Sequence, residues 1–485
     1  MGTLVFDFGT TALKTAVFDD NFRLLDRESF DFTYSYPATG RLECDPYLYA
    51  RAMFGTGRAA AAAARAAGCP VSRIAVTGQA ETLIFQDAGG QALGNAIVWL
   101  DDRAKEDAAR LGSAIPDLYA RTGNPGADPV MPLAKLPWIR RMCPDLDAAY
   151  TRALLLHDWA VWLLSGEFAG EYGILSCSGY FDIRKKRYDN DILDLAGIDA
   201  GRLAPPMPPG VTVGKLTAEA AAGMDLPAGI PVSNGTLDQC ASAIGAGNLR
   251  PGLVTETTGT VLAIGATLLD FDPERVGVPV LCHGLEGAYL ALPYCPTAGV
   301  LLKWFANEFL NGMDFAAIDR AVEAQTVRND RLICLPHFCG AGSPRPDPAA
   351  EGAFIGLTLD TTPADCARAI MESVAFLLRE NVEALRAAGC DAREILSLGG
   401  GAKSALWRQL KADALDLPVT APEIPESTAL GAALCAALAC GEITPSEIPA
   451  AKGPTAQPGA GRAGMQEKYE KYRRLNGLLA GISQS

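Results

Sequence analysis

Residues 4–18 read LVFDFGTTALKTAVF, and this stretch decides the fold. Apolar runs on either side of Gly9-Thr10-Thr11 predict a β-hairpin with a short polar loop. The same pattern returns at residues 248–265, NLRPGLVTETTGTVLAIG, where Thr258-Gly259-Thr260 separates two apolar runs. Two such units about half a chain apart predict two α/β domains of similar topology that face one another.

Further elements follow the first hairpin. Residues 22–32 supply a third strand, residues 46–67 have the spacing of a helix, and residues 73–77 form another buried strand. Glycine and proline near residues 246–251 mark a boundary. We therefore expect one domain at residues 1–247 and a second at residues 248–485.

The composition excludes several classes of protein. Of the 485 residues, 49% are hydrophobic and 20% are charged, which is typical of a folded chain with more than one domain. A net charge of −14 argues against nucleic acid and acidic membrane surfaces as partners. The 13 cysteines form no C-x-x-C pair, and neither a signal peptide nor a membrane span is recognisable. We expect a cytoplasmic protein without disulfides.

The first loop has the residues of a phosphate-binding turn. Gly9 lets the backbone approach a ligand closely, and Thr10 and Thr11 add hydroxyl donors to the backbone N–H groups. Asp7 would repel a phosphate unless Mg²⁺ lies between them, so the functional interpretation places a metal at Asp7. A plain hairpin with a turn glycine explains the same residues, and the pattern alone leaves both interpretations open.

The second half of the chain carries two more loops of this kind. Thr258, Gly259 and Thr260 repeat the first loop, and two such loops opposite each other would hold the two ends of a triphosphate. Residues 397–404, SLGGGAKS, predict a strand, a glycine-rich turn and the start of a helix, where backbone can approach a nucleotide. This segment is neither a Walker A loop nor a dinucleotide-binding fingerprint. A threonine-rich β-turn is the plain alternative for the second loop.

Asp238 is the candidate general base. Thr236, with Gln239 three residues later, has the pattern of a capping box, which places Asp238 in the first turn of a helix. In that position a carboxylate either stabilises the helix dipole or accepts a proton from an alcohol that attacks phosphorus. The spacing does not choose between the two.

Six segments together resemble the FGGY family of carbohydrate kinases. They are VFDFGTTALKTAVFD, NGTLDQ, TETTGTV, PHFCGAGSPRPDPAAEGAFIGL, SLGGGAKSALWRQLKADALDLPV and ESTALGAALCAALACG, and they span about residues 4–441. The resemblance implies an α/β fold of two actin-like, ribonuclease-H-like ATPase domains that flank a catalytic cleft. It further implies that the first domain binds mainly sugar and the second mainly ATP.

By position, the resemblance assigns roles to single residues. It implies that Asp238 is the catalytic base and that Asp7 is the acid associated with Mg²⁺. It assigns the contacts with ATP to Gly9, Thr10, Thr11, Thr258, Gly259, Thr260, Gly400, Gly401 and Ala402. It assigns the contacts with substrate hydroxyls to Gln79, Glu81, Trp99, Asp101, Arg103 and Gln239.

The substrate stays open at this point. Glycerol kinases usually have a tyrosine at the position of Val130 and an arginine at that of Ala80, while xylulose kinases usually have a histidine at that of Glu81. The motif set as a whole favours a xylulose-like ketopentose, with a polyol such as glycerol or erythritol as the alternative. A non-catalytic actin-like nucleotide switch is the rival from another class, and Asp238 in its motif argues against it. The sequence does not decide between a monomer and a homodimer.

Overall fold

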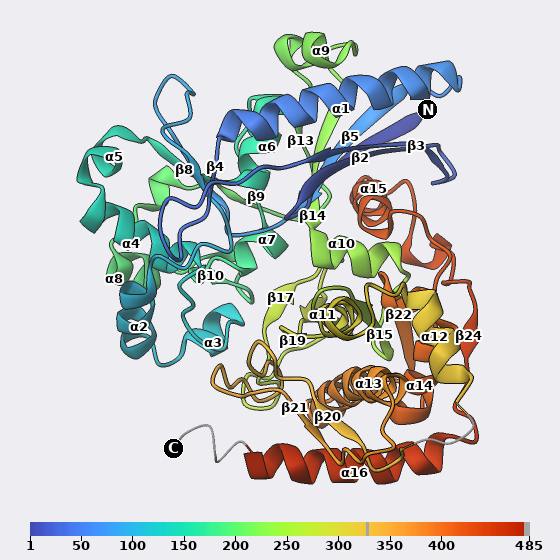
Figure 1. The fold of residues 1–485 in the computed structure, drawn as a ribbon. Coiled ribbons are helices and arrows are strands. Elements are labelled where there is room, and N and C mark those ends of the chain that lie inside the picture. Colours follow the sequence, from blue (N-terminus) through green and yellow to red (C-terminus); the bar gives the residue numbers. More distant parts are fainter. Residues whose placement is uncertain (326–328, 480–485) are drawn as a thin grey trace.

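Two mixed β-sheets, one from each half of the chain, organise the structure (Figure 1). The computed structural model describes residues 1–325 and 329–479. The first sheet contains β1 Gly2–Phe8, β2 Ala12–Phe18, β3 Leu24–Asp31, β5 Val71–Gly78, β13 Thr212–Lys215 and β14 Pro231–Leu237. The second contains β15 Leu253–Thr258, β16 Leu262–Leu268, β17 Val280–Cys282, β18 Tyr289–Ala291, β19 Tyr294–Cys295, β22 Glu394–Leu398, β23 Val419–Thr420 and β24 Thr455–Ala456.

The two sheets repeat one topology. In the first sheet, β3 extends the antiparallel hairpin β1-β2 on one side, while β5 and β14 follow parallel to β1 on the other. In the second sheet, β18 extends the hairpin β15-β16, and β22 and β23 follow parallel to β15. The two predicted hairpins and the duplicated α/β architecture are therefore confirmed. The strands predicted at residues 22–32 and 73–77 are β3 and β5.

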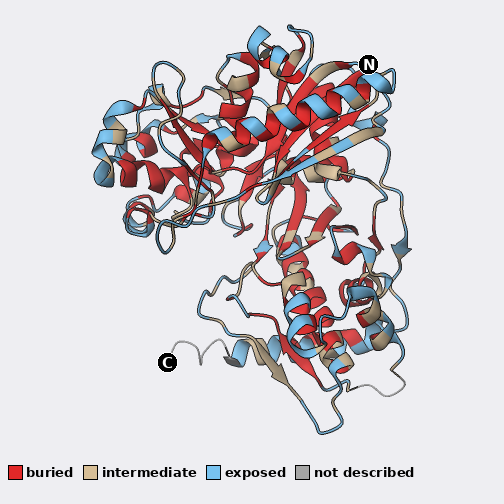
Figure 2. Cartoon of the chain, turned by 45° about the horizontal axis from the view of Figure 1, so that its top comes forward, coloured by how far each residue is buried: buried red, intermediate tan, exposed pale blue. Residues whose placement is uncertain are grey.

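Helices cover both faces of the first sheet. All seven residues of β1 are buried, because α1 (Pro46–Ala66) covers one face and α15 (Ser427–Ala439) covers the other. The helix α1 matches the prediction for residues 46–67, and it begins at Asp45, whose side chain accepts a hydrogen bond from the backbone N–H of Tyr47. Figure 2 shows the outer face of α1 exposed to solvent above buried strands.

Two helices pack backbone to backbone between the sheets. The helix α10 (Asp238–Gly245) follows β14 and lies beside α15 (Figure 1). A Cβ atom added at Gly431 would lie 1.7 Å from the carbonyl oxygen of Ala241, and one added at Gly245 would lie 1.9 Å from that of Ser427. Glycine is therefore required at both contacts. Since α15 comes from the second half of the chain yet packs on the first sheet, the two halves share this layer.

The remaining helices surround these layers. They are α2 Lys105–Ala114, α3 Leu118–Thr122, α4 Pro132–Met142, α5 Pro144–Ala149, α6 Leu156–Ser165, α7 Tyr172–Ser176, α8 Asn190–Ala196, α9 Ala218–Met224, α11 Gly299–Phe309, α12 Phe315–Glu323, α13 Pro363–Ala387, α14 Ala405–Leu415 and α16 Arg462–Leu479. Short strands complete the fold: β4 Glu43–Cys44, β6 Leu83–Gln86, β7 Ala96–Ile97, β8 Arg152–Leu155, β9 Gly170–Glu171, β10 Phe181–Asp182, β11 Arg187–Tyr188, β12 Pro206–Met207, β20 Ile333–Leu335 and β21 Ala353–Ile355. Across the described ranges, every helix is too short or too polar to cross a membrane.

Candidate active site

Three parallel strands of the first sheet end at a common edge, and Asp238 lies there. Asp7 of β1 is opposite Thr77 of β5, and Thr77 is opposite Thr236 of β14. Asp238 follows two residues later as the first residue of α10. The carboxyl ends of parallel strands are the usual place for ligands in α/β sheets. The topology therefore brings the predicted base and the predicted metal-associated acid to one edge.

The capping box predicted at Thr236 is wrong. Thr236 still belongs to β14, the residue that precedes the helix is Leu237, and no side chain caps the helix. The Thr236 hydroxyl instead donates to Oε1 of the buried Glu171 at 3.3 Å. Because strand pairing and Glu171 engage Thr236, the helix begins without a cap from this side chain. The position of Asp238 in the first turn is confirmed.

Burial and neighbouring charges shift the pKa values of Asp238 and Asp7. Burial raises the pKa of Asp238 to about 7, the negative charge of Asp7 raises it as well, and hydrogen bonds from Gln239 lower it. Burial also raises the pKa of Asp7 to about 6, and the positive charge of Lys14 opposes this shift. A carboxylate with a pKa near neutrality is an effective proton acceptor at physiological pH. The edge thus holds a proton acceptor beside a second acid.

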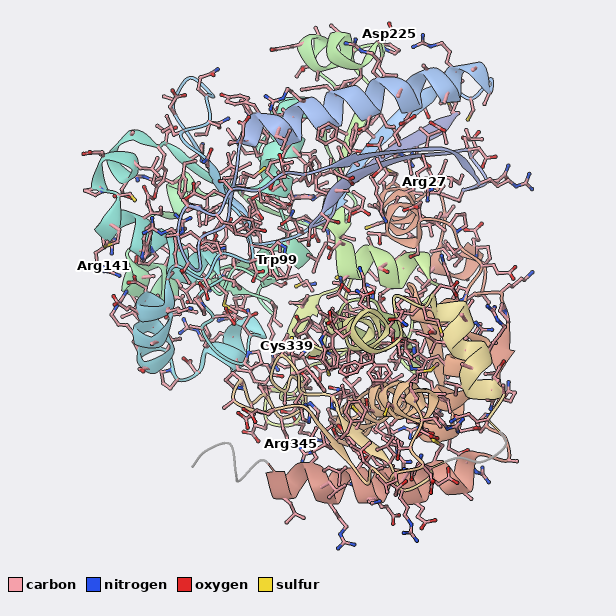
Figure 3. The ribbon with its side chains drawn as sticks, viewed as in Figure 1. Arg27, Trp99, Arg141, Asp225, Cys339 and Arg345 are labelled. Atoms are coloured by element: carbon pink, nitrogen blue, oxygen red, sulfur yellow. The ribbon has the colours of Figure 1, made fainter. Side chains whose placement is uncertain are left out.

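The first loop is held by residues predicted to contact the substrate. The Gln79 side-chain amide donates to the carbonyl oxygen of Gly9 at 3.1 Å. The indole N–H of Trp99 donates to Oγ1 of Thr10 at 3.1 Å, and Figure 3 shows Trp99 in the middle of the molecule. Thr11 is exposed. The predicted phosphate loop and part of the predicted sugar site are therefore one connected unit.

A fully buried lysine holds the backbone of the predicted sugar site. Nζ of Lys135, on α4, donates to the carbonyl oxygens of Val98 at 3.0 Å, Trp99 at 3.3 Å and Glu81 at 3.4 Å. These three acceptors match the three N–H donors of a lysine ammonium. Glu81 itself has a φ of 68°, in the left-handed region that glycine favours. The lysine thus fixes a strained residue and its neighbours.

Several acids, together with Arg103, lie near Lys135 in the region predicted to bind the substrate. Burial raises the pKa of Glu81, the charge of Lys135 opposes the rise, and the charges of Asp128 and Asp238 add to it. Burial lowers the pKa of Lys135, and the charge of Glu81 opposes that shift. Three carboxylates therefore interact at the side of the first sheet that carries Asp238.

Asp101 and Arg103 contact each other. Oδ1 of Asp101 accepts from Nε of Arg103 and Oδ2 accepts from Nη2, both at 2.7 Å. Nη2 also donates to Glu43, and the guanidinium lies 5.2 Å from the ring centre of Trp138. Oδ2 of Asp101 accepts a further bond from the backbone N–H of Leu42. Asp101 is fully buried and uses both oxygens inside the chain, so its contribution to a ligand would pass through Arg103.

The second sheet has an equivalent edge. Thr257 of β15 is opposite Leu398 of β22, so the loop Thr258–Thr260 and the turn Gly399–Gly401 are neighbours. A Cβ atom on Gly401 would lie 2.7 Å from Cβ of Thr258. Gly259 and Gly400, in contrast, have open space where a Cβ atom would lie. Glycine therefore permits a close contact between the loops at one position and leaves backbone accessible at the other two.

These residues suit a magnesium nucleotide. Glycine-rich turns with accessible backbone accommodate phosphate groups, and Mg²⁺ is usually held by one or two carboxylates together with the phosphates. Asp7 is the carboxylate at the first loop. Within residues 1–325 and 329–479, no group of three or more His, Cys, Asp or Glu side chains forms a closed metal site.

Both halves of the sequence match models of one protein family. Residues 3–245 match the N-terminal domain of the FGGY family of carbohydrate kinases, and residues 254–440 match the C-terminal domain. The chain belongs to this family. It is therefore a phosphotransferase, and FGGY carbohydrate kinases use ATP with Mg²⁺.

Relatives of this FGGY kinase carry two different names. A xylulose kinase of Bacillus subtilis is 27% identical over 440 residues, which cover 90% of this chain and 87% of the relative. A glycerol kinase of Trichlorobacter lovleyi is 31% identical over 468 residues, which cover 90% of each chain. The structure of a xylulose kinase from Rhodospirillum rubrum superimposes with a TM-score of 0.93, 27% identity and complete coverage of both chains. The two-domain α/β fold is thus confirmed, whereas the substrate subgroup is not resolved.

Several residues of this FGGY kinase site were not predicted from the sequence. Lys14 lies opposite Asp7 in the first hairpin, and its Nζ lies 3.4 Å from Oε2 of Glu426, just before α15. Glu426 also pairs with Arg27, which Figure 3 shows beside α15. The signal in the sequence was a single lysine inside an apolar strand. The buried Lys135 has a similar signal, one charge within residues 131–139, which are otherwise apolar.

Proposed function

We propose that this FGGY kinase phosphorylates a hydroxyl of a neutral sugar of about pentose size, with Asp238 as general base. The observation that carries the proposal is the Asp238 carboxylate at the first turn of α10, beside Asp7, with its pKa raised to about 7. A xylulose-like ketopentose is the first candidate, and a polyol such as glycerol or erythritol is the second. In this proposal residues 1–247 bind mainly the sugar and residues 248–485 bind mainly ATP.

The proposed mechanism uses Asp238 to accept the hydroxyl proton. The substrate oxygen bonds to the γ-phosphorus of ATP while the bond between that phosphorus and the ADP oxygen breaks and ADP leaves, and the hydroxyl proton passes to the Asp238 carboxylate, which must be ionised to act. When bound, MgATP supplies the phosphoryl group and the positive charge of the metal. Asp7 would hold that metal. The first loop, Gly9–Thr11, the second loop, Thr258–Thr260, and the turn at Gly400, Gly401 and Ala402 would hold the nucleotide.

The charges of the sugar side support a neutral substrate. Glu81, Asp128 and Asp238 are acids that interact there, and Lys135 directs its N–H groups to backbone carbonyls. A sugar acid or a sugar phosphate would meet net repulsion. Glu81 would accept hydrogen bonds from adjacent hydroxyls of a neutral sugar, with Trp99 and Gln239 beside it. Gln79 supports the first loop, and Arg103, held by Asp101, would donate to a further hydroxyl.

A direct screen tests this proposal. Purified protein is incubated with MgATP and xylulose, ribulose, glycerol, erythritol or gluconate, and ADP is quantified by chromatography. We expect turnover with a neutral sugar or polyol and none with gluconate. Glu81→Gln should raise the sugar KM by roughly one to two powers of ten, because a hydrogen bond to a charged group is lost, and should leave the ATP KM unchanged. Turnover of gluconate alone, or an unchanged sugar KM in the variant, would contradict the substrate assignment.

A further inference from the structure

A buried ion pair lies beneath the loops proposed to hold the nucleotide. Lys411 of α14 and Glu256 of β15 are both fully buried, and Nζ of Lys411 donates to Oε1 of Glu256. Ser397, at the end of β22, donates to the same oxygen. The network therefore joins α14 to the two parallel strands that end at the nucleotide loops.

The network also includes the second loop itself. The Thr258 hydroxyl donates to Oε2 of Glu256 at 2.7 Å and accepts from Nζ of Lys411 at 2.9 Å. Thr258 is 1% exposed, so its hydroxyl is turned inward and both of its bonds are made within the chain. Trp407, in the first turn of α14, lies with its ring centre 5.4 Å from Nζ of Lys411. One cation on the helix that follows the glycine-rich turn thus contacts the second loop directly, and Glu256 connects it to Ser397 on the strand that precedes the turn.

We propose that Glu256 and Lys411 are positioning residues that set the spacing between the second loop and the glycine-rich turn, and so determine nucleotide affinity. The two loops pack so closely that a Cβ atom on Gly401 would lie 2.7 Å from Cβ of Thr258, so a change in the position of Thr258 acts directly on the glycine-rich turn. Serine and threonine hydroxyls bonded to a fixed carboxylate cannot rotate, which keeps the strand ends in one arrangement. The inference rests on the proposed placement of the nucleotide.

Stability alone would not require this pair. Replacing a buried ion pair with apolar residues of similar volume is often neutral for stability, whereas removing one partner leaves an uncompensated buried charge. The double variant Glu256→Leu/Lys411→Met therefore separates positioning from folding. If the pair is purely structural, the double variant should bind nucleotide as the wild type does. If the pair orients Thr258 and Ser397, the double variant should bind nucleotide more weakly.

Calorimetric titration with MgADP provides the test, together with thermal melting of each variant. In the double variant we expect a protein that still folds, with a melting temperature lowered only by the loss of the acceptor for Thr258 and Ser397, and an MgADP Kd raised about tenfold. Ser397→Ala, which removes only one hydrogen bond, should raise the Kd about two- to fivefold and keeps the test valid if the double variant fails to fold. Lys468→Met is the matched control, because this lysine pairs with Glu372 at 2.8 Å on α13, away from the loops. It should leave the Kd within twofold.

Gly400→Val tests the placement of the nucleotide separately. Gly400 has open space around a Cβ position, so valine should fold and obstruct the nucleotide. An unchanged Kd in Gly400→Val would overturn the nucleotide placement and the inference with it. A raised Kd in Gly400→Val, with wild-type Kd values in the double variant and in Ser397→Ala, would overturn the positioning role alone. An equal loss of affinity in Lys468→Met would also overturn it, because the effect would then be general.

Discussion

Replacing Asp7 with asparagine should move the acid limb of the pH profile to lower pH. Burial raises the pKa of Asp238 to about 7, and the negative charge of Asp7 contributes to that rise. The base acts when ionised, so activity falls as the pH drops below its pKa. Without the neighbouring charge the carboxylate ionises more easily, its pKa falls, and the limb follows it downward.

The sheet gives the size of this shift. β1 and β14 are separated only by β5, so Asp7 and Asp238 lie about two strand spacings apart, roughly 10 Å. At an effective dielectric constant of about 20, two charges at this distance interact by about 1.7 kcal/mol. That energy corresponds to a shift of about one pKa unit. Asp7 itself has a pKa of about 6, so its charge acts on Asp238 only above that pH. At pH 6.5 the wild type, with Asp238 near pKa 7, should keep about a quarter of its plateau kcat/KM, and Asp7→Asn, with a pKa about one unit lower, about three quarters of its own plateau.

The assay is kcat/KM for MgATP between pH 5 and 8.5, at saturating sugar, with ADP quantified directly. This parameter reports the enzyme before the metal reaches Asp7, so the charge of Asp7 is still uncompensated. Asp20→Asn is the control, because Asp20 is exposed at the far end of the hairpin and pairs with the N-terminus. The acid limb of the Asp20→Asn pH profile should lie at the same pH as that of the wild type. A limb that stays in place in Asp7→Asn, or that persists unchanged in the residual activity of Asp238→Asn, would refute the assignment of the base.

Two further predictions concern buried groups. Lys135→Met should lower the free energy of unfolding by about 3–5 kcal/mol in denaturant titrations, because the charge of Glu81 and three buried carbonyls lose their cation. The same variant should have a higher sugar KM and an unchanged MgADP Kd. An unaltered sugar KM would show that the lysine does not position the sugar site. Burial lowers the pKa of His283 to about 4 in the folded protein. As the pH drops from about 6.5 towards 4, this histidine is protonated in the unfolded chain but not in the folded protein, so the free energy of unfolding falls over this range. The wild type should lose about 3 kcal/mol relative to His283→Asn over this range, and parallel stability curves for the two proteins would contradict the prediction.

The sequence was informative where structure depends on neighbouring residues. Apolar runs interrupted by Gly9 or Gly259 predicted both hairpins, because strand periodicity and glycine breaks act over a few residues. The spacing of Thr236 and Gln239 predicted that Asp238 lies in the first turn of a helix, and this place is confirmed. The cap at Thr236 failed, because a distant partner, Glu171, engages the threonine in the folded protein. The local sequence pattern around Thr236 gives no indication of a hydrogen-bond partner as distant as Glu171.

Contacts between residues far apart in the chain could not be predicted from the sequence. The packing of α15 on the first sheet depends on a backbone contact between Gly431 and Ala241. The ion pair of Glu256 and Lys411 joins residues 155 positions apart. Lysine is rarely fully buried in proteins, so the sequence alone would place Lys411 at the surface, whereas its side chain is fully buried. Only the tertiary structure shows the acceptors that make this burial tolerable.

The buried side chains of Lys135 and Lys411 hold the two proposed binding regions through different acceptors, backbone carbonyls in one case and side chains in the other. Lys135 donates to backbone carbonyls, so its hydrogen bonds do not depend on the side chain at position 81, although the charge of Glu81 favours the ionised lysine. Lys411 binds the side chains of Glu256 and Thr258, so a change at either partner leaves a buried charge or donor unpaired. Single substitutions in the region proposed for the sugar would therefore leave the hydrogen bonds of Lys135 in place. In the region proposed for the nucleotide, the anchor could be exchanged only by coordinated substitutions of Lys411 and its two partners.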